Sequence, residues 1–120
     1  MSSQSASLYG NAVRHLRFSF IETRLFSRLV KGYLSDSEYS DLQDKLIHKP
    51  EVGSVIRGSG GVRKFRWAAA GRGKRGGYRV VYFIRRQKNT IWLLTIYPKK
   101  VTDSIPGHVL KQIRKEIEDD

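Results

Sequence analysis

The sequence predicts a single α+β domain, with helices packed on one face of a mainly antiparallel sheet. The length of 120 residues suits one domain and is hardly enough for two. Apolar residues recur at helical spacing in the first half of the chain. The second half contains runs rich in β-branched and aromatic residues, which are typical of strands. The predicted order of elements is β-α-α-β-β-β-α.

The chain begins with a serine-rich segment that lacks periodicity. We expect residues 1–17 to be a flexible extension and residues 18–120 to form the domain. Residues 18–22 alternate as a short strand does. A helix is predicted over residues 24–34, because apolar side chains there recur along one face. These side chains are Leu25, Phe26, Leu29, Val30 and Tyr33.

A second helix is predicted to begin at a capping box. The Ser35 hydroxyl can accept from the backbone N–H of Glu38, whose carboxylate can accept from the N–H of Ser35. This helix has to end before Pro50, because a proline disfavours the helical conformation at the residue before it. Its apolar face consists of Tyr39, Leu42, Leu46 and Ile47.

Three strands and a helix are predicted for the rest of the chain. The strands are residues 62–69, 78–86 and 90–98, which form an antiparallel meander. The connection between the last two strands has hairpin length, whereas residues 71–77 form a longer, glycine-rich connection. The closing helix is residues 105–118, in which apolar residues recur four apart.

The composition excludes several classes of protein. The chain has no cysteine, which excludes a disulfide scaffold and thiolate metal sites. No apolar run approaches the roughly 18 residues that a spanning helix needs. The N-terminus also lacks the basic and apolar segments of a signal peptide. We therefore expect a cytoplasmic protein.

The positive charge is concentrated in one central segment. The formal net charge is +12, and residues 52–102 hold 13 Lys and Arg residues with no Asp or Glu. A field of one sign opposes the compact state through self-repulsion, so we expect it to serve a polyanionic partner, nucleic acid or ribosome. A membrane surface is the weaker alternative, because no predicted helix is both basic and strongly amphipathic.

The glycine-rich connection formally matches a dinucleotide-binding pattern. Residues 71–76 read G-x-G-x-x-G, but they lead into a strand instead of a helix, and no acidic residue follows at the expected distance. The segment also lacks the G-K-[ST] of a phosphate-binding loop. Two interpretations stay open: a solvated hairpin loop, or a loop that embraces a phosphate backbone through Arg72, Lys74 and Arg75.

Further cations lie on the predicted strands. Because side chains alternate along a strand, Lys64 and Arg66 share an outward face, and Phe65 and Trp67 point into the core. Arg79 on the next strand is expected on the same outward face, and Arg63 begins the run of basic residues. Among the aromatic residues, Tyr97 is the best candidate to stack on a base, with burial in the core as the alternative.

Ribonuclease chemistry through the substrate 2′-OH needs a base, an acid and cations at the phosphate. The three histidines, His15, His48 and His108, lie outside the basic strands. The basic segment holds no carboxylate pair, which disfavours two-metal chemistry, and no credible metal cluster is present. Lysines and arginines therefore have to supply most of the chemistry, with no metal or cofactor expected.

The strands and the loop between them resemble a known family. GSGGVRKFRWAAAGRGKRGGYRVVYFI, followed by WLLTIYPKK, is similar to the RelE/HigB family of bacterial toxins, and most similar to its HigB-like branch. The resemblance extends over about residues 18–118. It implies a compact α+β fold, neutralisation by an antitoxin and ribosome-dependent cleavage of mRNA.

The resemblance also implies roles for individual residues. The catalytic basic pair falls on Lys64 and Arg66, and the phosphate-holding arginine on Arg79. The basic residue after the last strand falls on Lys99. RelE-type members carry a tyrosine near the C-terminal end, where residues 102–105 have none, and often a lysine where Arg66 stands. The basic loop residues Arg72, Lys74 and Arg75 match those expected to contact ribosomal RNA. Beside the resemblance, Arg63, Tyr97 and Lys100 are further candidates for RNA or ribosome binding, because of their type and position.

The sequence thus predicts the toxin of a type II toxin–antitoxin module, a metal-independent endoribonuclease that uses the substrate 2′-OH. The expected partners are an antitoxin with a helix-turn-helix DNA-binding domain, the ribosome and mRNA. Operator DNA is expected to be bound only through the antitoxin complex. Two alternatives stay open: a non-catalytic RNA- or DNA-binding module, such as an antitoxin-bound co-repressor, and an inert module that holds an acidic partner.

Overall fold

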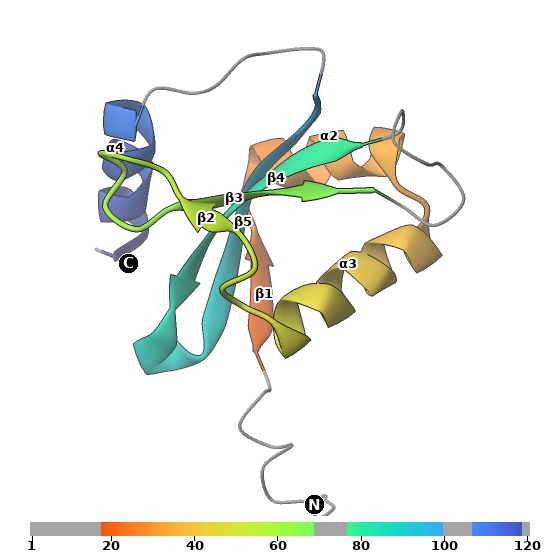
Figure 1. The fold of residues 1–120 in the computed structure, drawn as a ribbon, viewed down its shortest axis with the longest axis horizontal. Coiled ribbons are helices and arrows are strands. Elements are labelled where there is room, and N and C mark those ends of the chain that lie inside the picture. Colours follow the sequence, from red (N-terminus) through yellow and green to blue (C-terminus); the bar gives the residue numbers. More distant parts are fainter. Residues whose placement is uncertain (1–17, 69–76, 100–106, 119–120) are drawn as a thin grey trace, which may run out of the picture.

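The computed structural model describes residues 18–68, 77–99 and 107–118 (Figure 1). The predicted extension of residues 1–17 lies outside this part of the chain. The elements are β1 (Ser19–Glu22), α2 (Arg24–Tyr33), α3 (Asp36–His48), β2 (Ser54–Val55), β3 (Arg63–Trp67), β4 (Tyr78–Arg85), the 3-10 turn η2 (Arg86–Lys88), β5 (Thr90–Pro98) and α4 (Gly107–Glu118).

The strands form one five-stranded sheet in the order β1-β5-β4-β3-β2. β1 runs parallel to β5, and the other neighbours are antiparallel. The predicted α+β class and the antiparallel meander are confirmed. β2 was not predicted, because two residues are too few to show any alternation in the sequence.

The sheet carries helices on both of its faces. Helices α2 and α3 form one core with the strands, whereas α4 packs through Leu110 and Ile117 against the other face. Figure 1 shows α4 set apart from the other two helices. The prediction that all helices lie on one face was therefore wrong. In β4, Val80 and Tyr82 belong to the first core and Val81 and Phe83 to the second, as expected for a strand covered on both sides.

A register shift in β5 decides which face its C-terminal half presents. Val81 pairs with Thr95 and Tyr82 pairs with Leu93, so Leu94 is an extra residue in β5. The alternation of side chains is therefore reset at this bulge. As a result Tyr97 lies on the α4 face, directly opposite Arg79 in the register.

Side-chain caps begin both N-terminal helices. The predicted capping box of α3 is confirmed, with Ser35 and Glu38 bonded reciprocally at 3.1 and 2.8 Å. α2 is capped by Thr23, whose Oγ1 accepts from the N–H of Phe26 at 3.0 Å and donates to the carbonyl of Leu94 at 2.8 Å. The second bond ties the start of α2 directly to β5.

The Glu22 carboxylate joins β1 to both of these helices. It accepts from the Ser27 hydroxyl on α2 and, at 2.5 Å, from the Tyr39 hydroxyl on α3. Burial, and then the hydrogen bond to Glu22, raise the pKa of Tyr39 well above its ordinary value of 10.0. The folded protein therefore holds the Tyr39 proton more tightly than the unfolded chain does.

Replacing Tyr39 by Phe should destabilise the protein and change its response to alkali. Loss of a hydrogen bond to a charged group should lower the free energy of unfolding by about 1–2 kcal/mol at neutral pH. In the wild type, the raised pKa of Tyr39 contributes stability that is complete below about pH 10 and declines as the pH rises above that value. Urea melts across this range should show a shallower decline for Tyr39→Phe, and an unchanged alkaline profile would contradict this interpretation.

Candidate nucleic-acid and catalytic site

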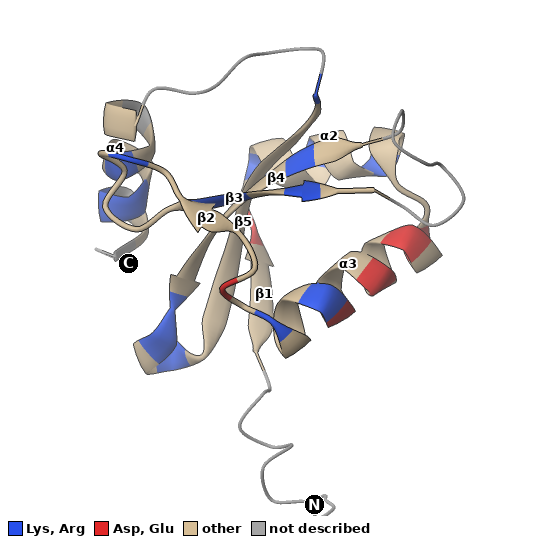
Figure 2. Ribbon diagram, in the orientation of Figure 1, with Lys and Arg blue, Asp and Glu red and all other residues tan. Residues whose placement is uncertain are grey.

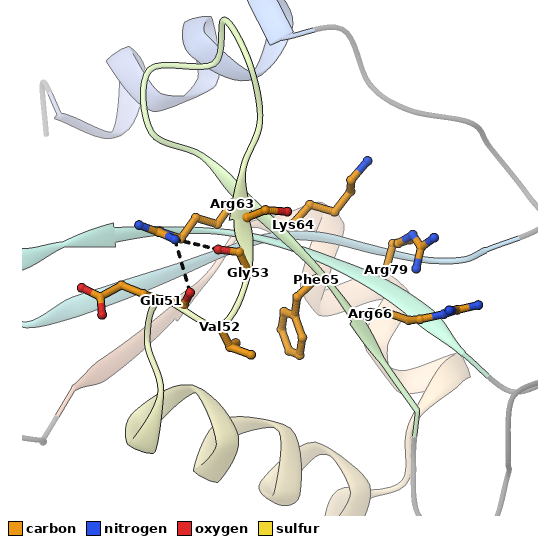
Figure 3. A pocket seen from close by; sticks show the side chains of 9 residues that line it. Glu51, Val52, Gly53, Arg63, Lys64, Phe65, Arg66 and Arg79 are labelled. Carbon is orange, nitrogen blue, oxygen red and sulfur yellow. Dashed lines mark hydrogen bonds between the residues drawn. The ribbon is translucent and has the colours of Figure 1, made fainter.

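Three basic side chains meet on one face across β3 and β4. Arg66 pairs directly with Arg79, and Lys64 pairs with Val81, two positions along the ladder. Lys64, Arg66 and Arg79 therefore share the α4 face of the sheet, as the alternation in the sequence predicts. We call these residues the cation row; Figure 3 shows their side chains extending from the two strands.

The cation row is electrostatically unfavourable in the free protein. Like charges placed directly opposite each other in an antiparallel sheet repel. Arg66 is exposed and Arg79 half-buried, so solvent screens the pair only in part. Among the described residues, no carboxylate pairs with either arginine; Glu51, which lies in the same cavity, pairs with Arg86 instead. The row is therefore suited to receive an anion.

A cavity of about 620 Å³ lies beside the cation row, along the edge of β3 (Figure 3). One wall is the segment that connects α3 to β2, and the other is β3 with Arg79 from β4. The side chains of the row line its basic part, which is large enough for a nucleotide unit. The lining residues are Glu51, Val52, Gly53, Ser54, Arg63, Lys64, Phe65, Arg66 and Arg79.

Buried hydrogen bonds hold the first wall in place. The fully buried Tyr82 hydroxyl donates to the carbonyl of Pro50 at 2.6 Å and accepts from the N–H of Gly53 at 2.9 Å. A Cβ at Gly53 would lie 2.9 Å from the Tyr82 ring and 3.0 Å from the carbonyl of Lys64, so only glycine fits there. The wall thus presses directly against the backbone of the cation row.

Arg63 is turned away from the cation row. It shares the α2/α3 side of β3 with Phe65, and its Nη1 donates to the carbonyls of Gly53 at 2.6 Å and Glu51 at 3.4 Å (Figure 3). Arg63 is among the residues expected to bind RNA, and in the structure its guanidinium fastens the wall. The sequence shows that Arg63 and Lys64 point to opposite faces of the strand. It does not show that the carbonyls of Glu51 and Gly53 lie within hydrogen-bond distance of the Arg63 guanidinium.

Tyr97 supports the cation row from β5. It pairs directly with Arg79, and its side chain is only 6% exposed. Burial raises the pKa of Tyr97, and the positive charge of Arg79 opposes this shift. A ring buried to this degree has no open face for a base, so this structure favours the core alternative over stacking. Lys99 follows β5 directly and is exposed.

The remaining candidates divide into two groups. Arg72, Lys74, Arg75 and Lys100, like His15 and residues 102–105, lie outside the described residues. His48 and His108 are described and exposed; neither lines the cavity, and His48 Nδ1 lies 2.8 Å from the carbonyl of Asp44. In residues 18–68, 77–99 and 107–118, no three potential ligands are grouped as a metal site would require. No helix in these same segments is long and apolar enough to cross a membrane.

Comparison with solved structures places the fold. A free mutant of the E. coli toxin RelE superposes with a TM-score of 0.51 at 16% sequence identity, over 81% of this chain and 96% of that one. The toxin in the intact E. coli RelBE toxin–antitoxin complex gives the same score and identity, over 68% and 96% of the two chains. No protein-family model matches the sequence. At this identity the likeness establishes a shared fold, the α+β fold of RelE toxins, and the predicted HigB-like branch stays a prediction.

Removing the Tyr82 hydroxyl should loosen the wall of the cavity. In Tyr82→Phe the ring stays, but the N–H of Gly53 and the carbonyl of Pro50 lose their partner. Leaving such buried groups unpaired should lower the free energy of unfolding by about 1–3 kcal/mol. Tyr33→Phe is the matched control, because no described group bonds to the Tyr33 hydroxyl. Equal chemical-denaturation midpoints for the two variants would contradict this role of Tyr82.

Proposed function

We propose that this protein is the toxin of a type II toxin–antitoxin module, in the HigB-like branch of the RelE superfamily, and that it cleaves mRNA on the ribosome. The observation that carries the proposal is the cation row beside a nucleotide-sized cavity in a RelE-like fold. A related fold is also known in complex with an antitoxin. The proposed setting is the bacterial cytoplasm.

The proposed reaction is attack of a ribose 2′-oxygen on the adjacent phosphorus. The new O–P bond forms as the bond to the 5′-oxygen breaks, which leaves a cyclic phosphate and a 5′-hydroxyl. Arg66 and Arg79 would hold the phosphoryl oxygens, where negative charge accumulates in the transition state. Two guanidinium groups that face each other across a ladder are positioned for two oxygens of one phosphate.

Proton transfer in this reaction falls to the amines. A guanidinium stays protonated near neutral pH, so Arg66 and Arg79 cannot remove the 2′-proton. Lys64 lines the cavity and Lys99 follows the strand that bears Tyr97, which makes these two the proposed groups for positioning the phosphate and moving protons. Of the residues that the structure describes, one carboxylate lines the cavity, Glu51, which is already paired with Arg86. This donor set fits a metal-independent reaction better than a two-metal one.

The proposed partners follow from this chemistry. A site with few acid–base groups gains most from a substrate that is already bent for in-line attack, which the ribosome would supply with the mRNA. The excess of positive charge suits an acidic antitoxin, which would carry a helix-turn-helix domain and bring the complex to operator DNA. The glycine-rich loop with Arg72, Lys74 and Arg75, together with Lys100, is proposed to contact ribosomal RNA.

A non-catalytic RNA-binding function is the second candidate. It is favoured by one observation: among the described residues no histidine lines the cavity, and the one carboxylate that does, Glu51, is in an ion pair. Such a protein would stop translation, or act with its antitoxin as a co-repressor, without cutting RNA. The two candidates differ in whether new RNA ends are formed.

Expression in a bacterial host, with growth followed and mRNA ends mapped by primer extension, tests the proposal. The wild type should arrest growth and produce new ends within reading frames. Arg79→Ala should abolish both, because loss of one transition-state contact lowers a rate by about 100- to 1,000-fold. Lys88→Ala, which removes an exposed cation from η2, should behave as the wild type.

The other outcomes of this experiment are equally informative. Growth arrest without new ends would favour the non-catalytic candidate. Equal losses of activity in Arg79→Ala and Lys88→Ala would show that net charge alone matters. The absence of any arrest by the wild type would contradict the toxin.

A further inference from the structure

The charged side chains of α2 are all basic. Arg24, Arg28 and Lys31 are all exposed, and the ten residues of α2 include no Asp or Glu. At 3.6 residues per turn, these three positions fall within an arc of about 60° and span roughly 10 Å of the helix. Figure 2 shows the contrast with α3, which carries acidic residues toward its start. Among the described residues, no carboxylate pairs with the three cations.

This arrangement is unfavourable for the helix itself. A cation in the first turn opposes the helix dipole, and Arg24 occupies that position. Like charges three and four residues apart repel each other, as Arg24 and Arg28, and Arg28 and Lys31, must do. α2 tolerates these charges because the Thr23 cap and the buried Phe26 anchor it from its other side. Lys31, in the last turn, suits the helix dipole, but Arg24 and the repulsion among the three cations do not stabilise the helix, so this arrangement points to another role.

α2 is both basic and amphipathic, contrary to the expectation from the sequence that no helix has this combination. Its apolar face, with Phe26 and Val30 at the centre, is buried in the core with α3 and the sheet. A membrane would need that apolar face, whereas the exposed part of α2 offers its three cations with one apolar side chain, Leu25, which is 41% exposed. This favours a polyanion with a charged outer surface.

Gly32 lies on the same exposed face and has no packing reason to be glycine. A Cβ built there meets no atom within 4 Å. Glycine inside a helix is less favourable than alanine, and its φ here is not one that requires glycine. What glycine provides is a bare stretch of helix next to Arg28 and Lys31, against which another backbone can approach closely.

We propose that Arg24, Arg28, Lys31 and Gly32 form a second nucleic-acid surface, the α2 surface, which binds the phosphate backbone of a folded RNA. The cations would face successive phosphates, and the bare helix at Gly32 would admit the sugar–phosphate chain. α2 covers the face of the sheet opposite to the cation row. One short strand cannot reach both faces, so the α2 surface would take a different segment of the RNA from the one at the cation row. The choice of RNA as the polyanion rests on the proposed function.

Salt-dependent binding of a labelled RNA hairpin tests this surface. The hairpin carries 2′-O-methyl groups, which prevent cleavage, and binding to the full chain is followed by fluorescence anisotropy over a series of KCl concentrations. Arg24→Gln with Arg28→Gln should weaken binding about 10-fold at low salt. It should also reduce the slope of log K against log salt by between about 1 and 2, since each lost phosphate contact removes roughly 0.7–0.9.

Lys111→Gln with Lys115→Gln is the matched control. These residues are also exposed and four apart on a helix, but α4 lies on the other face of the sheet from α2, and neither residue belongs to the cation row or lines its cavity. This double variant has the same net charge as the α2 variant, and its affinity should stay within about twofold of the wild type. Equal losses in the two variants, or no loss in the α2 variant, would overturn the proposal. RNA binding that is unchanged while an acidic partner protein is lost would also overturn it, in favour of a protein surface.

Gly32→Ala separates stability from binding. The added methyl group meets open space, so the melting temperature should rise by about 3–6 °C, whereas affinity for the hairpin should fall several-fold. A stabilised variant with full affinity would overturn the close approach at Gly32. Arg79→Ala should retain hairpin binding through the α2 surface, because Arg79 lies on the opposite face of the sheet. If the wild type binds the hairpin but cuts no mRNA in cells, the proposed function is contradicted and the α2 surface remains.

Discussion

The arrangement of the site depends on one cross-strand pair, Arg66 on β3 and Arg79 on β4, which the sheet holds directly opposite each other. Two guanidinium groups do not come together by their own attraction. The ladder between β3 and β4 brings them together, and the two hydrophobic cores on either side of the sheet supply the free energy that keeps the ladder in register. The repulsion between the two charges is then available to be relieved by an anion.

The two sides of β3 have different tasks. The side that faces α2 and α3 carries Phe65 in the core and Arg63 bonded to backbone carbonyls, so it holds the wall of the cavity. The other side carries Lys64 and Arg66, which the protein leaves without acidic partners among the described residues. The bulge at Leu94 contributes to the same site, because it places Tyr97 on the α4 face, directly opposite Arg79 in the register. The alternation of side chains along β3 thus places the residues that support the wall on one face and the two cations on the other.

The features of the fold and of the site that depend on neighbouring residues alone could be predicted from the sequence. Strand alternation placed Lys64 and Arg66 on one face, and the Ser35–Glu38 spacing placed the start of α3. The features that were missed depend on contacts between distant residues. The face of the sheet on which α4 packs depends on which face α2 and α3 leave uncovered. The continuous apolar run of β4 does indicate that both faces of the sheet are buried.

Arg63 and Tyr97 show the same limit at the site. Both were candidates for RNA contact, Tyr97 with burial in the core as its alternative; in the structure Arg63 is bonded to the wall and Tyr97 is buried. The orientation of the Arg63 guanidinium depends on hydrogen bonds to the carbonyls of residues 51 and 53, and the position of Arg63 in the sequence does not reveal these bonds. The face on which Tyr97 lies depends on a bulge of one residue, and no pattern in the sequence of β5 predicts the position of that bulge.

A double-mutant cycle on Arg66 and Arg79 tests the central claim, that this pair is a receptor for phosphate. The free energy of unfolding is measured for the wild type, Arg66→Gln, Arg79→Gln and the double variant, with and without a saturating 2′-O-methyl oligoribonucleotide. Without the oligonucleotide the coupling should be unfavourable by about 0.2–1 kcal/mol, as for like charges opposite each other in a sheet. With it, the coupling should become favourable. Coupling near zero under both conditions would show that the two arginines act independently, and it would contradict the account.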